Sequence, residues 1–255
     1  MSHDLQEPLR KVMAFGDRLR AKCEAQLGED GLGYLHRMQD AAKRMRQLIN
    51  DLLALSRVTT QAKPYEPVNL NTLVSEVLSD LEVLVEQVNG KVEVSPLPTV
   101  HADATQLRQL FQNLIGNALK FRKQDTPPVI RIQAQAAAAP DPGRDDSGNG
   151  HRRWQFTVQD NGIGFDEKYR DRIFEVFQRL HGRGEYEGSG IGLSLCRKIV
   201  SRHGGSISAE SQLGVGSKFS ILLPEQQAGT NGTAGPAPAP ATPVASPERP
   251  LAAAA

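Results

Sequence analysis

Apolar side chains recur at alternating spacings of four and three residues through the first part of the chain. This spacing predicts two amphipathic helices, over residues 3–27 and 32–58. A short turn at residues 28–31, Gly-Glu-Asp-Gly, joins them, so we expect the helices to run antiparallel. The apolar stripe consists of Leu5, Leu9, Val12, Gly16, Leu19 and Cys23 in the first helix, and of Leu35, Met38, Ala42, Met45, Ile49 and Leu52 in the second.

This stripe is wider than two helices can enclose, because Ala41, Leu48 and Leu55 extend it in the second helix. Pairing of two copies into a four-helix bundle would bury it. The alternative is packing against the rest of the same chain. We favour the homodimer.

After two prolines, Pro64 and Pro67, the periodicity becomes mixed. Helical patterns alternate in blocks with strand patterns, which predicts an α/β sandwich with helices on one face of a mixed sheet. The fold class is therefore α+β, a helical hairpin followed by this sandwich. The predicted helices are 71–88, 104–123 and 193–203, and the predicted strands are 91–95, 129–135, 154–159, 206–210 and 218–223.

Composition divides the chain into three parts, residues 1–62, 66–225 and 226–255. The last part is dominated by Ala, Pro, Gly and Thr, which cannot form a core, so we expect it to be disordered. Residues 136–150 have a similar composition between two predicted strands. We interpret them as a flexible hairpin insertion.

The 255 residues carry a net charge of +1, which favours neither a nucleic-acid partner nor an anionic membrane. No apolar run approaches the roughly 20 residues of a spanning helix, and no signal peptide is evident. The two cysteines, Cys23 and Cys196, have neither metal-site nor disulfide-framework spacing. We expect a soluble, cytoplasmic chain without a membrane segment.

Two glycine-rich runs carry the candidate chemistry. The run 160–164, Asp-Asn-Gly-Ile-Gly, follows a predicted strand, and the run 188–192, Gly-Ser-Gly-Ile-Gly, opens a predicted helix. A glycine-rich turn entering a helix presents free N–H groups and the positive end of the helix dipole, which suits phosphate oxygens. A dinucleotide fingerprint does not fit, because it needs Gly-x-Gly-x-x-Gly directly after a strand. A Walker motif does not fit either, because it needs Lys after the last glycine, where this chain has Leu193.

A third feature lies on the helix before the insertion. Asn113, Asn117 and Lys120 recur at spacings of four and three, so they share one face. Amide oxygens can ligate a hard cation, and a lysine can neutralise phosphate. This combination is what a magnesium triphosphate requires.

The order of these motifs strongly resembles the Bergerat-fold ATPases, and among them the catalytic domain of sensor histidine kinases, over residues 66–225. The resemblance implies ATP and Mg²⁺ as ligands. It implies that Asp160 accepts a hydrogen bond from adenine, that Gly162 and Gly164 let the backbone pass the base, and that Ser217 lies near the adenine. The implied phosphate-side residues are Asn113, Asn117 as the Mg²⁺ ligand, Lys120, Arg179, Gly188, Gly190, Gly192 and Leu193. Residues 166–190 would form a mobile lid.

The N-terminal run 2–9, Ser-His-Asp-Leu-Gln-Glu-Pro-Leu, resembles the phosphoacceptor box of the same kinases in its phytochrome-type variant. His3 would be the nucleophile, and Asp4 would orient its ring and accept its second proton. Glu7 stands where many family members have Thr or Asn, so the resemblance does not imply phosphatase activity. Only two residues precede His3, and we expect either a shortened start or a piece of a longer protein.

The leading hypothesis is the transmitter core of a two-component histidine kinase, which phosphorylates His3 from ATP and then an aspartate of a response-regulator receiver. A hydrolytic ATPase of the same superfold is the first alternative, but Gln112 stands where those enzymes carry a catalytic glutamate. A nucleotide-binding dimeric scaffold is the second, and the His3–Asp4 pair speaks against it. The sequence leaves open whether phosphoryl transfer occurs within one chain or across a dimer.

Overall fold

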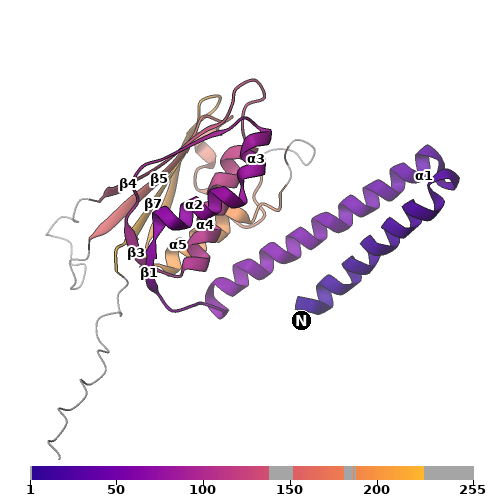
Figure 1. Cartoon of the computed structure of the whole chain (residues 1–255), viewed down its shortest axis with the longest axis horizontal. Helices are drawn as coiled ribbons and strands as arrows, with labels where there is room; N and C mark the ends of the chain where they lie inside the picture. Colours follow the sequence, from indigo (N-terminus) through magenta and orange to yellow (C-terminus); the bar gives the residue numbers. More distant parts are fainter. Residues whose placement is uncertain (1, 138–151, 181–185, 187, 227–255) are drawn as a thin grey trace, which may run out of the picture.

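The computed structural model of the chain describes residues 2–137, 152–180, 186 and 188–226, with side chains from residue 6 onward. The helix α1 (Ser2–Thr60) is interrupted at Gly28, whose φ of 62° is unfavourable for any residue with a Cβ. The chain reverses direction there, so α1 is a hairpin of two antiparallel helices (Figure 1). The predicted hairpin is confirmed, although the turn is confined to Gly28 and the second helix begins earlier than predicted.

An α/β domain follows the hairpin. Its elements are β1 (Glu66–Asn69), α2 (Leu70–Asp80), α3 (Glu82–Gln87), β2 (Lys91–Val94), β3 (Thr99–Ala102), α4 (Ala104–Lys120), β4 (Val129–Ala136), β5 (Arg153–Asp160), η1 (Glu167–Tyr169), η2 (Arg172–Phe174), α5 (Gly192–Arg202), β6 (Ser206–Gln212) and β7 (Gly216–Pro224). Five strands form one sheet in the order β2-β4-β5-β7-β6. The pair β2–β4 is parallel and the other pairs are antiparallel, which confirms the mixed sheet.

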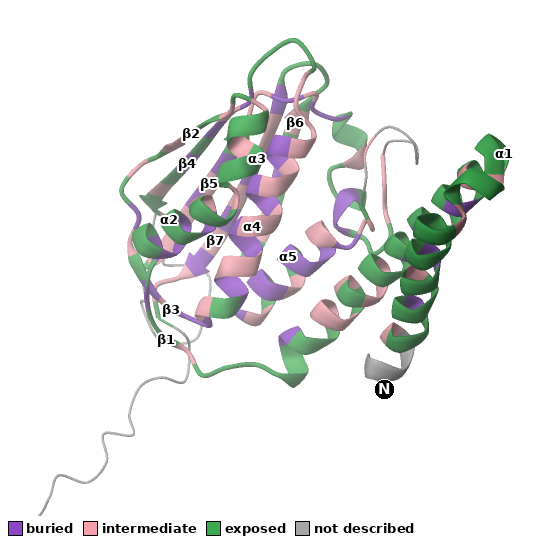
Figure 2. Ribbon diagram, turned by 45° about the vertical axis from the view of Figure 1, so that its right-hand side comes forward, coloured by how far each residue is buried: buried purple, intermediate pink, exposed green. Residues whose placement is uncertain are grey.

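Helices α2, α4 and α5 cover one face of this sheet (Figures 1 and 2). Helix α4 turns its apolar side toward the sheet, and Leu107, Leu114 and Ile115 are completely buried. Alternate residues of the strands meet them, such as Ile130 and Ile132 of β4, because successive side chains of a strand point to opposite faces. The predicted sandwich with helices on one face is thereby confirmed.

The predictions were wrong in two places. The helix predicted over residues 71–88 is interrupted at Leu81, which separates α2 from α3. The short strands β1 and β3 were not predicted, and they form an antiparallel pair of their own. Neither feature has a local signal, because no glycine or proline marks the break and each strand has only four residues.

The insertion joins β4 to β5, which are antiparallel neighbours paired up to Ala136 and Trp154. Residues 138–151 and 227–255 lie outside the described residues, and with them lie most of the predicted flexible insertion and the predicted disordered tail. Within the described residues, no helix combines the length and the apolar character needed to cross a bilayer.

The junction between α1 and the α/β domain, residues 58–65, is held in place by packing of Val58 in the core and by hydrogen bonds. Val58, near the end of α1, is 4% exposed and belongs to the core of the α/β domain. The side-chain amide of Gln106 donates to the carbonyl oxygen of Val58 at 3.0 Å. The backbone N–H of Lys63 donates to the carboxylate of Asp103 at 2.9 Å, and Arg202 donates to the carbonyl oxygen of Lys63 at 3.1 Å.

Candidate functional site

A cavity of about 630 Å³ lies between α4, the N-terminus of α5, the segment that precedes α5 and the second helix of α1. It collects all the predicted site residues except His3, Asp4 and Gly162. The predicted residues that line it are Asn113, Asn117, Lys120, Asp160, Gly164, Arg179, Gly188, Gly190, Gly192, Leu193 and Ser217.

Asp160 ends β5 at one side of this cavity. The backbone N–H groups of Gly162 and Ser217 both donate to its Oδ1, at 2.8 and 3.2 Å. Burial raises the pKa of the Asp160 carboxyl, and these two hydrogen bonds oppose the rise. Gly162 therefore contributes through its N–H to the orientation of Asp160, although it does not line the cavity itself. In the described part of the chain, no hydrogen bond occupies Oδ2.

Gly162 and Gly164 also lie very close to other segments of the chain. A Cβ on Gly162 would collide with the backbone oxygen of Phe121, and one on Gly164 with that of Gln212. Gly164 also has a φ of 62°, which favours glycine. The close approach is thus between segments of the chain itself, and the loop is held by its own backbone packing.

The polar face of α4 lies opposite the N-terminus of α5. Within the described residues, the side-chain nitrogen of Asn113 is buried and has no hydrogen-bond partner, which is rare in a folded protein. A Cβ on Gly192, the first residue of α5, would lie 3.3 Å from Oδ1 of Asn113. The ammonium of Lys120 lies 4.4 Å from the centroid of the Phe121 ring.

In the described residues, no side chain caps the N-terminus of α5. Gly190, Ile191, Gly192 and Leu193 line the cavity there. The φ values of Gly188 and Gly190, 145° and 76°, are ones that residues with a Cβ rarely adopt. An uncapped helix N-terminus next to a glycine-rich turn is suited to bind phosphate oxygens.

Arg179 supports the segment that leads to this helix. Its guanidinium donates to the backbone oxygens of Gly188 and Tyr186, at 2.9 and 2.5 Å. The ring of Tyr186 lies 5.0 Å from the ring of Phe121, centroid to centroid, at the end of α4. In this structure Arg179 therefore braces the glycine loop from within the wall of the cavity.

Two groups of lining residues were not predicted. The first is an apolar wall that includes Ile163, Phe165 and Ile173. Its signal in the sequence was present, because Ile163 and Phe165 flank Gly164 in the first glycine run. The second group comes from the second helix of α1 and has no local signal, since only the tertiary structure brings that helix to the cavity. It consists of Gln47, Asn50, Asp51 and Ala54.

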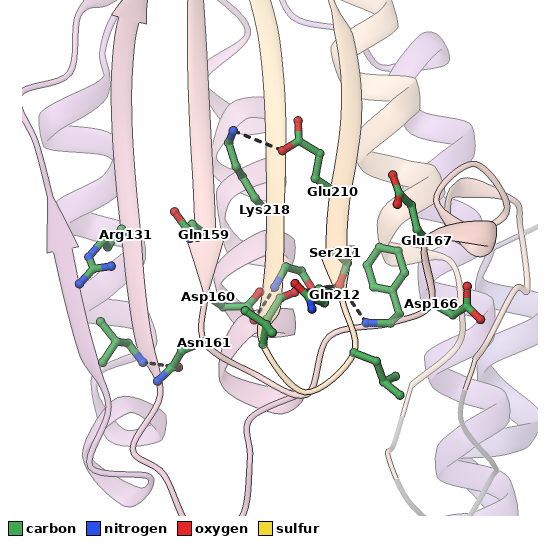
Figure 3. A pocket seen from close by; sticks show the side chains of 16 residues that line it. Arg131, Gln159, Asp160, Asn161, Asp166, Glu167, Glu210, Ser211, Gln212 and Lys218 are labelled. Carbon is green, nitrogen blue, oxygen red and sulfur yellow. Dashed lines mark hydrogen bonds and ion pairs between the residues drawn. The ribbon is translucent and has the colours of Figure 1, made fainter.

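A second hollow of about 850 Å³ lies on the face of the sheet that the helices leave uncovered (Figure 3). Its sheet portion is polar, with Arg131, Gln159, Glu210 and Lys218, and Lys218 forms an ion pair with Glu210 at 3.5 Å. It includes neither the α4 asparagines nor the second glycine run. The first cavity is therefore the candidate nucleotide site.

Comparison with protein families agrees with this geometry. Residues 102–227 match the family described as histidine kinase-, DNA gyrase B- and HSP90-like ATPase. Residues 1–61 match the His Kinase A phospho-acceptor domain. The chain belongs to the histidine kinase family. It comprises the phosphoacceptor and ATPase domains of a sensor histidine kinase transmitter core.

Curated relatives of this kinase chain include phytochromes. It is 40% identical to cyanobacterial phytochrome A of Nostoc sp. over 223 residues, 88% of this chain and 27% of the relative. It is 38% identical to the phytochrome-like protein Cph1 of Synechocystis sp., over 88% of this chain and 28% of the relative. The chain thus spans little more than a quarter of the length of either protein.

Solved structures of histidine kinases share the fold of this kinase chain. Full-length ShkA in complex with AMPPNP superposes with a TM-score of 0.62 at 26% identity, over 89% of this chain and 45% of that one. ThkA, in its complex with the response regulator protein TrrA, has a TM-score of 0.56 at 20% identity, over 88% of this chain and 61% of that one. The ThkA likeness shows the fold alone.

The proposed acceptor of this kinase chain, His3, lies with Asp4 in the first turn of α1. Their side chains lie outside the described residues. The first described contact of this turn is made by Gln6, whose side-chain amide donates to Oδ1 of Asn50 at 2.7 Å.

The residues of the cavity fit ATP with magnesium. The unpartnered buried amide of Asn113 and the uncapped start of α5 offer hydrogen bonds to phosphates. Within the described residues, no cluster of three His, Cys, Asp or Glu side chains could hold a metal ion alone.

Proposed function

We propose that the chain binds Mg²⁺–ATP in the cavity beside α4 and α5 and transfers the γ-phosphoryl group to His3. The observation that carries this proposal is the cavity itself. In one place it joins the partly buried carboxylate of Asp160, the buried side-chain nitrogen of Asn113, which has no partner among the described residues, and a helix N-terminus without a side-chain cap. The likeness to ShkA, solved with AMPPNP, supports a nucleotide as the ligand.

Each part of the site has a role in this proposal. Oδ2 of Asp160 accepts a hydrogen bond from the adenine amino group, while Oδ1 is held by the two backbone N–H groups. Asn117 is the residue that would hold Mg²⁺, and bound Mg²⁺ supplies positive charge that neutralises phosphate oxygens. Asn113, Lys120 and the start of α5 position the phosphates. Arg179 acts on them through the glycine loop that it braces.

Transfer to His3 forms a bond between a ring nitrogen and the γ-phosphorus and breaks the bond from that phosphorus to the β–γ bridging oxygen, so ADP leaves. Asp4 accepts the proton of the other ring nitrogen as positive charge develops. The phosphoryl group then passes to an aspartate of a response-regulator receiver domain, as membership of the histidine kinase family supports. We further propose a homodimer through α1 and a cytoplasmic location for these domains.

Labelling with γ-labelled ATP and Mg²⁺ tests this function. We expect acid-labile, base-stable label on the wild-type chain, none on His3→Gln, and none when a chelator removes Mg²⁺. Label that persists on His3→Gln would contradict the assignment of the acceptor. Free phosphate without labelled protein would instead favour the hydrolytic alternative, and bound nucleotide without turnover would favour the scaffold.

A second variant separates nucleotide binding from folding. Because burial raises the pKa of Asp160, its ionised form lowers stability at neutral pH. Asp160→Asn should therefore abolish binding of a fluorescent ATP analogue without lowering the thermal midpoint of the ligand-free protein. A large fall of that midpoint would show that Asp160 is required for folding and would leave its role in nucleotide binding without support.

A further inference from the structure

The second helix of α1 forms one wall of the nucleotide cavity. Gln47, Asn50, Asp51 and Ala54 line it, and their spacing of three or four residues places them on one face of the helix. The side-chain amide of Gln47 donates to Asp51 at 2.8 Å, so this wall is polar. The hairpin of the same chain thus closes part of the cavity. Residues of the hairpin and of the α/β domain, which are far apart in the sequence, line the same site.

One residue of this wall also contacts the acceptor helix. Oδ1 of Asn50 accepts the hydrogen bond from Gln6, at 2.7 Å. His3 precedes Gln6 by three residues, which is about 4.5 Å along a helix axis. A hydrogen bond between two exposed amides contributes little free energy, but it fixes the proximity of the acceptor turn to the wall of the cavity.

The junction, residues 58–65, holds the α/β domain beside the hairpin of the same chain. Only residues 61–65 separate the end of α1 from the start of β1, and fully extended they would span about 17 Å. They are also fastened at Lys63, and the hydroxyl of Tyr65 donates to the carbonyl oxygen of Arg202 at 2.9 Å. Val58 lies in the core just before them. A swing of the α/β domain toward the helix of a partner would break these hydrogen bonds and expose Val58.

We propose that the phosphoryl group passes within one chain, from the nucleotide held by the α/β domain to His3 of the same chain. This inference rests on the proposed kinase function and adds the identity of the acceptor copy. In a dimer, the nucleotide in each cavity would then phosphorylate His3 of the same chain, whose hairpin forms part of the cavity wall. The Asn50–Gln6 hydrogen bond joins this wall to the helix that carries His3. The bonds formed and broken are those described for the transfer to His3.

Mixed dimers test this proposal. One chain carries His3→Gln and keeps its cavity, and the other carries Asn117→Asp and keeps its acceptor; two different affinity tags isolate the mixed species. With γ-labelled ATP and Mg²⁺, transfer within one chain predicts loss of label to background on both chains. Label on the Asn117→Asp chain would overturn the proposal, because that phosphoryl group could come only from the cavity of the partner.

Two controls separate the failure of this inference from the failure of the proposed function. A mixed dimer of the wild-type chain with Asn117→Asp must carry label on the wild-type chain alone. If the wild-type homodimer itself stays unlabelled, the kinase function fails and the inference fails with it. If no mixed dimer can be isolated, dilution of the wild-type chain to concentrations at which sedimentation shows monomers decides: labelling that persists on monomers supports transfer within one chain, and labelling that is lost together with the dimer contradicts it.

Discussion

In the α/β domain the apolar side of α4 is completely enclosed, whereas much of α1 is exposed (Figure 2), including about half of its predicted stripe. Leu107, Leu114 and Ile115 of α4 are 0% exposed. In α1 Leu9 and Gly16 of the first helix and Leu35 and Ala42 of the second are buried. Five further stripe residues are about two-fifths to one-half exposed. They are Val12, Leu19, Met38, Met45 and Leu52.

The difference shows that the α/β domain buries its apolar side chains within one chain, whereas the hairpin does so only in part. The α/β domain encloses its own core, because helices and sheet supply complementary apolar faces. The hairpin uses one half of its stripe for the contact between its own helices and leaves the other half uncovered along both helices. A second hairpin placed against this half would complete a four-helix bundle, which supports the proposed homodimer.

The largest expected effect is a cavity in the α/β core. Leu114→Ala removes a completely buried side chain from α4, one residue after Asn113. Large-to-small substitutions of this kind cost about 2–5 kcal/mol of unfolding free energy. Denaturant unfolding should show this loss, together with weaker nucleotide binding. The matched variant Leu19→Ala, at a 41% exposed position of α1, should leave the unfolding of the α/β domain unchanged; an equal loss in both variants would contradict the distinction between the two regions.

The second effect concerns the uncovered half of the stripe. Met45→Glu places a charge on a 48% exposed position, where it costs little in a monomer but would be buried in a four-helix bundle. Sedimentation velocity should show monomers at concentrations at which the wild-type chain is dimeric, with the nucleotide affinity of the α/β domain retained. Ala21→Glu is the control and should remain dimeric, because Ala21 lies on the side of the first helix that faces away from the apolar stripe. Dimers that persist in Met45→Glu would exclude this surface as the interface.

The smallest effect is a pH dependence of the stability, caused by His203 at the junction between α1 and the α/β domain. His203 is completely buried, accepts a hydrogen bond at Nε2 from the N–H of Asp103 and packs against Tyr65. Burial lowers the pKa of His203 below its ordinary value of 6.5, and the charge of Arg202 acts in the same direction, whereas the hydrogen bond to the carbonyl oxygen of Ile199 and the charge of Asp103 oppose this shift. The unfolded chain therefore binds this proton more readily, so the stability that neutral His203 contributes is complete above pH 6.5 and is lost as the pH falls below it.

Thermal unfolding measured from pH 7.5 downward checks this sign. The wild-type midpoint should fall as the pH drops through the range below 6.5. His203→Gln should reduce this dependence, whereas His36→Gln, which removes an exposed histidine of α1, should not. A wild-type midpoint that rises on acidification would show that His203 gains, rather than loses, its proton affinity on folding.

The sequence by itself determined the features that local spacing encodes. The alternation of apolar residues predicted the hairpin, and the block pattern predicted the sandwich with helices on one face. The Asn113–Asn117–Lys120 face and the two glycine runs predicted part of the polar lining of the cavity. These predictions succeeded because helix periodicity, strand alternation and glycine turns depend on near neighbours in the chain.

Tertiary structure decided what depends on contacts between distant residues. The pairing of β1 with β3, the bracing of the glycine loop by Arg179 and the packing reasons for Gly162 and Gly164 all require partners far along the chain or a specific loop conformation. The same holds for the wall that Asn50 forms beside the cavity, and for the junction at Lys63 and Arg202 that holds it there. Local patterns define which surfaces need a partner, but only the packed chain defines which partner each surface meets.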